Sequence, residues 1–437
     1  MLLVYMRVLV ISQVVFSRTN NTGKTLSSYF RGFHSDEVAQ LYFHSEIPTD
    51  KSICTNYYRF NDVDAIKSIF NRKVRGKSFC ASDIRTDISN GRTDTGIKRR
   101  VYMVGSKHTP IALFLRDLIW KLSNWKNNNL FEWIEQFNPD VIFFLSGDGS
   151  FTYRICQYIA KKYSIPFISM CVDDYYINNR NKGRLFFNLQ HRSFMKTVNK
   201  CYKNTYCILT ICDKMRGEYG RLFNKKCYTL RTSASNKKIA STSSKNRLSY
   251  MGNVGYKRYE QLIMMGRALS SIVGEKLPKT IDIYSGSLNP EYINPLRNAQ
   301  GVSFHGEKSP EELLNIMSES IAVIHTESFD PIFMDLTRYS VSTKIAESLM
   351  YGPCLIAYGP EGIASIDYLK ENKAAYVITR SEDLESGLQE ILTNAELREQ
   401  IVENARRLAA KNHDEAVNPT KVREWLQMAI NDHKEGE

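Results

Sequence analysis

Several features are missing from this 437-residue sequence, and each absence narrows the class of protein. No apolar run is long enough to span a bilayer. The nine cysteines are odd in number and include no C-x-x-C pair, which disfavours disulfides and a zinc site and indicates reduced thiols in a cytosolic protein. With 43% hydrophobic residues the chain can bury ordinary cores, and its length predicts two or three domains.

A complete phosphate-binding loop is also missing, although the letters TGKT resemble its end. The pattern requires a glycine five positions before GK[ST], where the chain turns around a phosphate, and Arg18 stands there. The preceding residues 6–13 form an apolar run typical of a buried parallel strand. Because Arg7 interrupts the apolar start and no cleavage site follows, we expect a first strand rather than a signal peptide. An ATPase is the weaker hypothesis, and the favoured one is a substrate-facing loop at the carboxyl end of this strand, made of Thr22, Gly23, Lys24 and Thr25.

Positive charge is concentrated in the first half of the chain. Residues 1–235 contain 36 Lys and Arg against 18 Asp and Glu, whereas residues 248–437 contain 19 against 28. This asymmetry indicates that one domain faces an anionic partner, such as a membrane surface, a lipid phosphate or a nucleic acid. A basic surface without a partner explains the same numbers. Nucleic acid is the least favoured partner, because no basic stretch has the interleaved aromatic residues of an RNA-binding sheet.

Short apolar runs alternate with helical patterns along most of the chain, which predicts α/β units with parallel sheets covered by helices. Residues 236–247 have linker composition, and a second alternating unit follows them. We therefore expect four segments, with boundaries at 1–235, 236–247, 248–415 and 416–437, the last a helix that folds back on the first domain. Residues 71–100, which are polar and highly charged, are predicted to form a loop.

Four motifs in the second half follow one another in a familiar order: YMGNVG, VSFHGEKSPEELLNIM, AVIHTESFD and STKIAESLMYGPCLIAYGPEG. They resemble the glycosyltransferases of the GT-B fold, specifically the retaining family 4. In the first half NTGKTLSSYF, IPFISMCVDDYY and CDKMRGEYGRLF resemble the members that act in bacterial capsule, exopolysaccharide and O-antigen synthesis. The resemblance implies two Rossmann-like domains with a cleft between them, the first binding the acceptor and the second a nucleotide sugar such as a UDP- or GDP-sugar. It implies no cofactor and no metal, because protein cations stabilise the leaving diphosphate.

The family signature consists of two glutamates separated by seven residues. Glu347, in KIAESLMYGPCL, matches the second, whose two carboxylate oxygens accept hydrogen bonds from the ribose diol of the donor. Glu327, in HTESFD, matches the context of the first, which contacts the donor sugar and is a candidate catalytic residue. An insertion, PIFMDLTRYSVS, separates the two, so that Tyr339 occupies the position that strict spacing assigns. The alternatives are a solvated helix residue for Glu347 and a structural acid for Glu327.

The donor diphosphate requires cations and backbone N–H groups. Three candidates lie at the predicted start of the Glu347 helix, where unpaired N–H groups and the helix dipole favour anions: Ser342, Thr343 and Lys344. The remaining donor-site candidates lie in the insertion, within or after the strand SYMGNV, or at a strand end: Arg338, Gly252, Lys257, Arg258 and His325. For His325 a structural role is the alternative.

Two acids are candidates in the first domain. Asp173 and Asp174 follow the apolar strand PFISMCV, and the carboxyl end of a parallel strand is where such folds bind ligands. Paired carboxylates there would bind acceptor hydroxyls or a cation, and we include both among the catalytic candidates. A helix N-cap with a solvated neighbour is the structural alternative.

Three of the four tryptophans fall in one amphipathic stretch, IALFLRDLIWKLSNWKNNNLFEWIEQF. Trp120, Trp125 and Trp133 beside Lys and Arg suit a membrane interface, which a lipid-linked acceptor would require. Core packing of two helices explains the same pattern.

The sequence therefore predicts a cytoplasmic glycosyltransferase, peripheral on the inner face of the cell membrane, that acts on a lipid-linked or oligosaccharide acceptor. Two further hypotheses stay open. A GT-B epimerase would bind the same donor and need no acceptor, and a catalytically silent scaffold would bind it without turnover.

Overall fold

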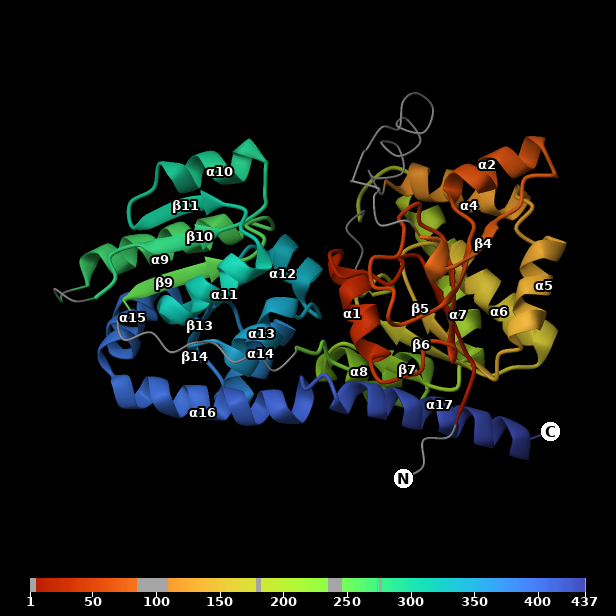
Figure 1. Ribbon diagram of the computed structural model, residues 1–437. Coiled ribbons are helices and arrows are strands. Elements are labelled where there is room, and N and C mark those ends of the chain that lie inside the picture. The colour runs from red at the N-terminus through yellow and green to blue at the C-terminus, as the bar shows by residue number, and fades with distance from the viewer. Residues whose placement is uncertain are drawn as a thin grey trace. The chain divides into compact units, whose positions relative to one another are not determined.

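The computed structural model describes residues 5–84, 109–177, 182–234, 246–272, 274 and 277–436. Within them the chain divides into two compact units, each built on its own sheet (Figure 1). The first unit comprises Met1–Leu230 and Pro419–Glu437, and the second comprises Arg231–Asn418. The predicted α/β class is confirmed. Most of the proposed linker, 236–247, lies outside the described residues.

An eight-stranded sheet forms the centre of the first unit, in the order β4-β3-β2-β1-β5-β6-β7-β8. Neighbouring strands are parallel, except that β4 runs antiparallel to β3. The strands β1, β2, β5 and β6 are buried along their whole length, as expected for apolar runs covered on both faces. The strand bounds are β1 (Val8–Ser12), β2 (Val38–Tyr42), β3 (Asn56–Arg59), β4 (Lys77–Cys80), β5 (Val141–Leu145), β6 (Phe167–Cys171), β7 (Ile208–Thr210) and β8 (Cys227–Thr229).

Helices of the first unit begin and end at residues suited to those positions. Asn61 and Asp64 form a capping box at the start of α2, and Asn138 and Asn224 end α5 and α8 in the left-handed conformation that asparagine tolerates. The helix bounds are α1 (Asn21–Tyr29), α2 (Asp62–Phe70), α4 (Pro110–Leu122), α5 (Asn128–Phe137), α6 (Ser150–Tyr163), α7 (Phe187–Asn204) and α8 (Asp213–Phe223), with a 3-10 turn η1 (Ala81–Asp83).

The loop predicted over 71–100 is wrong in its described part, which contains β4 and η1. Phe79 of β4 stacks on Tyr57 of β3, with ring centroids 5.4 Å apart and an interplanar angle of 12°. One aromatic pair across the sheet edge thus keeps an otherwise polar segment in the sheet. Residues 85–100 lie outside the described residues.

A six-stranded, wholly parallel sheet forms the second unit, in the order β11-β10-β9-β12-β13-β14. Its strands are β9 (Arg247–Met251), β10 (Ile281–Tyr284), β11 (Val302–Gly306), β12 (Ser320–Thr326), β13 (Cys354–Tyr358) and β14 (Tyr376–Ile378). Its helices are α9 (Arg258–Ser271), α10 (Pro290–Arg297), α11 (Pro310–Glu319), α12 (Pro331–Thr337), α13 (Thr343–Tyr351), α14 (Ala364–Glu371), α15 (Leu384–Thr393) and α16 (Ala395–Asn412), with a 3-10 turn η2 (Ser381–Asp383). The helices α10, α11 and α12 each start with proline after a capping Asn, Ser or Asp.

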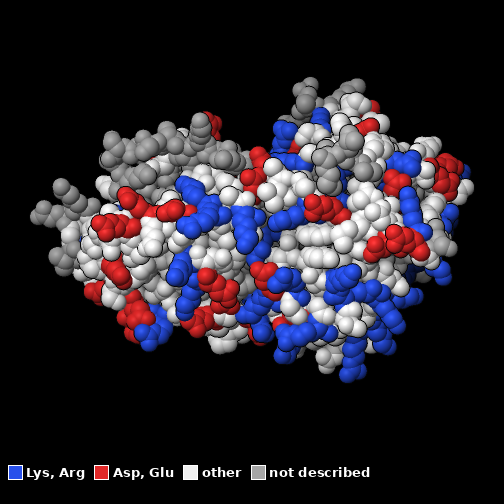
Figure 2. Space-filling view, turned by 90° about the horizontal axis from the view of Figure 1, so that it is seen from below, with Lys and Arg blue, Asp and Glu red and all other residues white. Residues whose placement is uncertain are grey.

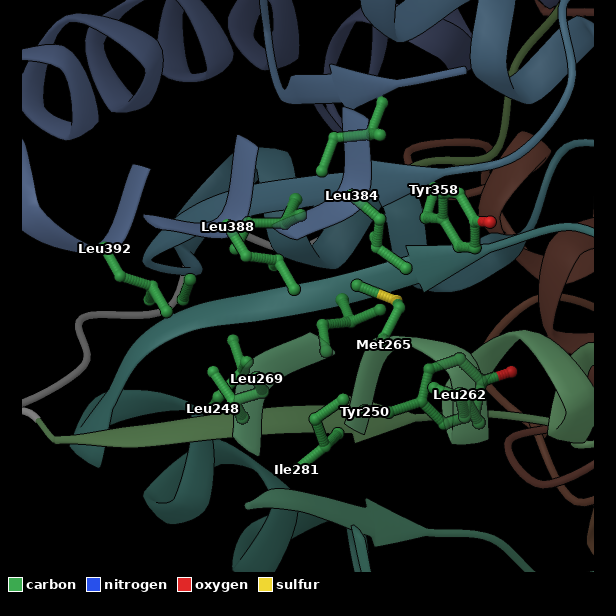
Figure 3. Packing of buried hydrophobic residues seen from close by; sticks show 14 of the residues in the cluster. Leu248, Tyr250, Leu262, Met265, Leu269, Ile281, Tyr358, Leu384, Leu388 and Leu392 are labelled. Atoms are coloured by element: carbon green, nitrogen blue, oxygen red, sulfur yellow. The ribbon is translucent and has the colours of Figure 1, made fainter. Parts of the chain in front are cut away.

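Apolar side chains at helical spacing fill the core on one face of the second sheet (Figure 3). Leu262, Met265 and Leu269 of α9 recur every three to four residues. In α15, leucines recur every four residues, at 384, 388 and 392. Both rows pack against Leu248 and Ile281 from the strands. A second cluster covers the opposite face with residues of α13, α14 and α16. The sheet is therefore buried on both sides, which leaves its carboxyl edge and the loops there for binding.

The last helix, α17 (Val417–Glu435), packs on the first unit. Arg423 donates from Nη1 to Glu37 Oε1 at 2.9 Å and from Nη2 to Oε2 at 2.7 Å, and the Glu37 side chain is only 1% exposed. Backbone N–H groups of Met6 and His34 donate to the same two oxygens. Burial raises the pKa of Glu37, but these hydrogen bonds outweigh burial and the net pKa is lowered. No helix among the described residues is long and apolar enough to cross a membrane.

Removing the cation of this buried pair should destabilise the first unit. We expect Arg423→Met to lower its free energy of unfolding by about 3–5 kcal/mol, because it leaves the Glu37 carboxylate buried without a cation. Urea unfolding measures the change. Arg407→Met is the matched control: Arg407 pairs with Glu403 at the surface, with both side chains more than two-thirds exposed, and should change stability by less than about 0.5 kcal/mol. Equal losses in the two variants would contradict the prediction.

Candidate functional site

The order of strands in the second sheet reverses at β9, which pairs with β10 on one side and β12 on the other. In open α/β sheets, ligands bind at the carboxyl ends of the strands where the order reverses. The residues there are 252–258, which follow β9, and 327–330, which follow β12. We call this region the β9/β12 edge.

A buried ion pair joins the two strand ends. Arg258 donates from Nε to Glu327 Oε2 at 3.1 Å and from Nη2 to both carboxylate oxygens, at 2.9 and 2.8 Å. The two side chains are only 13% and 1% exposed. Burial lowers the pKa of Arg258, but the adjacent Glu327 carboxylate more than offsets this and the net pKa is raised. Burial raises the pKa of Glu327, and the Arg258 guanidinium opposes this only in part. The pair therefore fixes a guanidinium, with its positive charge, at the edge of the sheet.

His325 lies next to this pair at the end of β12. Its Nε2 is 3.1 Å from Ser365 Oγ and 3.6 Å from Glu327 Oε1. Burial, with a smaller contribution from Arg258, lowers the pKa of His325 to about 3, so the imidazole is neutral at physiological pH. A neutral, buried imidazole between two structural partners fits the structural alternative better than direct contact with a phosphate.

The turn between β9 and α9 is strained. Tyr256 and Lys257, neither of them glycine, have φ angles of 56° and 57°. Left-handed conformations of this kind cost roughly 1–3 kcal/mol each and persist where surrounding contacts hold them. Here Lys257 Nζ donates to Asp330 Oδ2 at 2.9 Å, and Arg258 is held by Glu327. Gly252 and Gly255 do not have a positive φ, so the unusual backbone of this turn is that of Tyr256 and Lys257.

The first turn of α13 contains the other cluster of candidates. Ser342 caps the helix, its Oγ accepting from the Lys344 backbone N–H at 3.3 Å, and Thr343 is the first helical residue. Lys344 Nζ donates to Glu347 Oε2 at 2.7 Å, and the Glu347 side chain is 19% exposed. The lysine and glutamate therefore lie on one accessible helix face, where a cation and a carboxylate can bind a diphosphate and a diol.

The insertion between the two glutamates folds as α12 and a short connection. Arg338 ends α12 with an exposed side chain 5.4 Å from the Tyr339 ring, and its carbonyl accepts from Ala364 N at 2.9 Å. Tyr339 is 3% exposed. The residue that strict spacing assigns to the first signature position is thus a core tyrosine, which has no carboxylate to offer a sugar.

In the first unit, the loop expected at Thr22–Thr25 is wrong, because these residues form the first turns of α1. Asn20 caps the helix and accepts from the backbone N–H groups of Thr22 and Gly23. A Cβ on Gly23 would lie 2.5 Å from the Val15 carbonyl oxygen, so glycine is required for close packing of the helix, and not for a phosphate cradle. Lys24 is exposed and Thr25 is buried.

Asp173 and Asp174 follow β6, as expected, but they start no helix. Asp174 Oδ1 accepts from the backbone N–H groups of Tyr176 and Ile177 and from the Tyr219 hydroxyl at 2.8 Å. Asp173 Oδ2 accepts from the Tyr175 hydroxyl at 3.4 Å. The N-cap alternative is therefore wrong for both acids. Asp174 therefore holds the turn after β6.

Three residues of the site were missed from the sequence: Asp330, Tyr256 and Ser365. Only Asp330 has a local signal, because an Asp before Pro331 is typical of a capped helix start. The other two are recognisable only from their contacts. Among the described residues, no group of three His, Cys, Asp or Glu side chains could hold a metal ion.

Several solved structures match this chain over nearly its whole length. A crystal structure of Anabaena Alr3699/HepE in complex with UDP has a TM-score of 0.61 at 11% identity, covering 97% of this chain and 100% of that one. Sucrose-phosphate synthase (tll1590) from Thermosynechococcus elongatus has a TM-score of 0.61 at 9% identity, covering 98% and 100%. WaaG, a glycosyltransferase involved in lipopolysaccharide biosynthesis, has a TM-score of 0.53 at 12% identity, covering 96% and 99%. This chain has the GT-B fold.

Within this GT-B protein, residues 270–419 match a family described as glycosyl transferase-like. The matched segment includes β12, α12 and α13, and therefore Glu327, Lys344 and Glu347. No curated protein sequence matches the chain significantly.

The buried pair at the β9/β12 edge predicts a specific pattern of stability. Arg258→Ala should lower the free energy of unfolding of the second unit by about 3–5 kcal/mol, because it leaves the Glu327 carboxylate buried and uncompensated. The double variant Arg258→Met/Glu327→Leu should recover most of this loss, because it buries no charge. Urea unfolding tests both, and a double variant as unstable as the single one would contradict the pair's electrostatic role.

His325 should make the second unit sensitive to mild acid. Its pKa is lowered to about 3 on folding, so below about pH 6.5 the unfolded chain binds a proton that the folded chain does not. The free energy of unfolding should therefore decrease as the pH is lowered below about 6.5, by about 1.4 kcal/mol per pH unit for His325. His325→Gln keeps a donor near Ser365 and removes the titration. Unfolding curves at pH 7 and pH 5 should show a smaller loss in the variant, whereas equal losses would show that His325 is not responsible.

Proposed function

We propose that this GT-B protein is a retaining glycosyltransferase of the family 4 type, which transfers a sugar from a UDP- or GDP-sugar to a hydroxyl group. The observation that supports this most directly is the position of Arg258. It lies at the reversal of the second sheet, in the domain whose sequence matches the glycosyl transferase-like family. Among the described residues its Nη1 has no hydrogen-bond partner, since Glu327 uses Nε and Nη2. A guanidinium held in this way can bind a phosphate with its remaining donors.

The two clusters of the second unit divide the donor between them. Arg258 and Lys344, with the backbone N–H groups at the start of α13, bind the diphosphate, whose charge grows as the bond to the sugar breaks. Glu347 accepts hydrogen bonds from the two ribose hydroxyls. Arg338, on the exposed end of α12, adds a further cation. Glu327 acts as a positioning residue, because it holds Arg258 and is buried away from a sugar.

Transfer follows a front-face course in this proposal. The bond from the anomeric carbon to the phosphate oxygen breaks, and a bond to the acceptor oxygen forms on the same face. The leaving phosphate oxygen takes the acceptor proton, so no side chain is required as a base. Protein cations neutralise the diphosphate, which makes a metal ion unnecessary for this step. Asp173 in the first unit is the candidate for binding the acceptor hydroxyl, whereas Asp174 supports the turn beside it.

The acceptor is a lipid-linked or oligosaccharide one in surface polysaccharide synthesis, used at the inner face of the cell membrane. The support for this is the resemblance of the first-half motifs to capsule, exopolysaccharide and O-antigen enzymes, together with the basic charge of residues 1–235.

A silent scaffold that binds nucleotide sugar is the second candidate, and one observation favours it. Glu327, the expected sugar contact, is bound to Arg258, and Tyr339 stands in the core at the position that the signature spacing assigns. A scaffold would be stabilised by nucleotide and would neither transfer nor hydrolyse the donor.

Nucleotide-dependent melting tests the donor site. At 100 times its Kd, a nucleotide that binds the folded state should stabilise it by about 2.7 kcal/mol, or roughly 5–10 °C in Tm. We expect this shift with UDP or GDP, and not with CMP or ATP. Glu347→Gln should reduce it because the ribose diol loses a carboxylate, and Arg258→Met/Glu327→Leu should reduce it because the diphosphate loses a cation.

Lys24→Ala is the matched control, since it removes an exposed lysine that the proposal does not use, and its shift should equal that of the wild type. A shift with ATP alone, or one lost in Lys24→Ala and kept in Glu347→Gln, would refute the donor site. Release of UDP from UDP-glucose separates the enzyme from the scaffold, because only the enzyme turns the donor over.

A further inference from the structure

Helix α4 of the first unit has its amphipathic pattern reversed. Six of its residues are exposed, and all but Lys121 are large and apolar, with exposed fractions of 43–51%: Ile111, Phe114, Leu115, Leu118 and Leu122. Their spacing of three to four residues places them on one face. Trp120, on the opposite face, is 1% exposed and stacks on Phe151 with ring centroids 4.0 Å apart. Trp120 and Trp133 therefore belong to the core, as the core-packing alternative predicts, while Trp125 is half-buried and an apolar stripe faces outward.

The neighbouring helix α7 extends this surface and adds charge. Leu185, Phe186 and Leu189 at its start are 75%, 56% and 60% exposed, and α7 packs beside α4. Further along the same helix, basic residues recur every three to four positions, all of them exposed: Arg192, Lys196, Lys200 and Lys203. The exposed face of α7 thus changes from apolar to basic along its length. We call these residues of α4 and α7 the α4/α7 surface.

A groove of about 1310 Å³ lies between α4, α6 and α7 and continues the basic part of this surface. Its lining includes seven lysine and arginine side chains of the first unit: Lys121, Lys126, Arg154, Lys161, Lys196, Lys200 and Lys225. Among the described residues, Asp432 is the only carboxylate that lines it, and it accepts a hydrogen bond from the Tyr206 hydroxyl. The groove extends from Phe151, in the first turn of α6, to the amino ends of β6 and β7, at Pro166 and Tyr206.

Figure 2 shows Lys and Arg side chains gathered over the first unit, in the right-hand half of the view, with fewer acidic side chains among them. A partner for the α4/α7 surface must match both features, because it must take up apolar side chains and neutralise several cations. Nucleic acid would satisfy the cations but leaves the leucine and phenylalanine side chains in water. A bilayer with anionic lipids satisfies both, since the acyl boundary takes up the stripe and the headgroups contact the lysines.

We infer that the α4/α7 surface docks this protein on an anionic lipid bilayer, with the stripe of α4 inserted at the headgroup boundary and the α7 lysines on lipid phosphates. The inference deepens the proposed function, because a lipid-linked acceptor lies in such a membrane. It depends on no residue of the donor site. It specifies an interfacial helix, which lies in the plane of the membrane and does not cross it.

Vesicle co-sedimentation of the full chain tests this surface. We expect binding to vesicles of phosphatidylcholine with 30% phosphatidylglycerol, weaker binding at 0.5 M salt, and little binding to phosphatidylcholine alone. Lys196→Gln/Lys200→Gln should weaken partitioning by roughly 20- to 30-fold, at about fivefold per cation near the surface. Leu115→Ser/Leu118→Ser should weaken it by at least as much, because two inserted side chains lose their apolar contact.

Two matched controls complete the design. Leu222→Ser/Leu288→Ser removes two exposed leucines elsewhere, and Arg267→Gln/Lys411→Gln removes two exposed cations of the second unit, so both should bind as the wild type does. Absence of vesicle binding, or binding that the α4 substitutions leave unchanged, would overturn the inference. So would a wild-type dimer in light scattering that Leu115→Ser/Leu118→Ser makes monomeric, because the stripe would then be covered by a second copy.

The melting shift with UDP or GDP, measured on the same variants, keeps the two proposals apart. Variants that lose vesicle binding and keep the nucleotide-dependent shift in Tm support membrane docking by the α4/α7 surface independently of the donor site. A wild type that binds vesicles and no nucleotide would refute the donor site alone.

Discussion

The buried pair of Arg258 and Glu327 is the interaction on which the second unit's binding edge depends. A carboxylate that is 1% exposed is stable as an anion only beside a cation, and Arg258 supplies that cation from the neighbouring strand end. The bond connects the chain after β9 to the chain after β12, at the reversal of the strand order. It also helps to hold the two left-handed residues before α9, whose strain would otherwise favour another turn.

This pair gives the two glutamates of the predicted signature different surroundings. The insertion between the two glutamates forms α12, which places Tyr339 in the core and leaves Glu327 to pair with Arg258. Glu347 keeps an accessible position because α13 begins after the insertion, at a serine cap that the local sequence defines. Glu327 is thus buried beside a cation, whereas the Glu347 carboxylate lies nearer to solvent, although the sequence assigns both to one motif. Local context identifies such residues, but only their neighbours separate a ligand contact from a support.

The two ends of the first sheet have different chemistry. Its carboxyl edge holds hydrogen-bonded acids after β6, which suit hydroxyl groups, whereas the groove at the amino ends of β6 and β7 is basic. The outward apolar face of α4 continues toward that basic end through α7. The charge of residues 1–235 indicates only an anionic partner. The fold places part of that charge beside an apolar stripe, so the partner must also take up apolar side chains.

The sequence by itself determined the α/β class, most strands and helices, and the location of the donor candidates. These depend on the spacing of apolar residues, on helix caps and on the α13 motif, which are local properties. It did not determine that Thr22–Thr25 are helical, since packing of Gly23 against Val15 is a contact between segments. Nor did it show which face of α4 is buried, because the more apolar face is the exposed one and only the stacking of Trp120 on Phe151 fixes the opposite face in the core. The partner of Glu327 lies 69 residues away, and only the pairing of β9 with β12 brings the two side chains together.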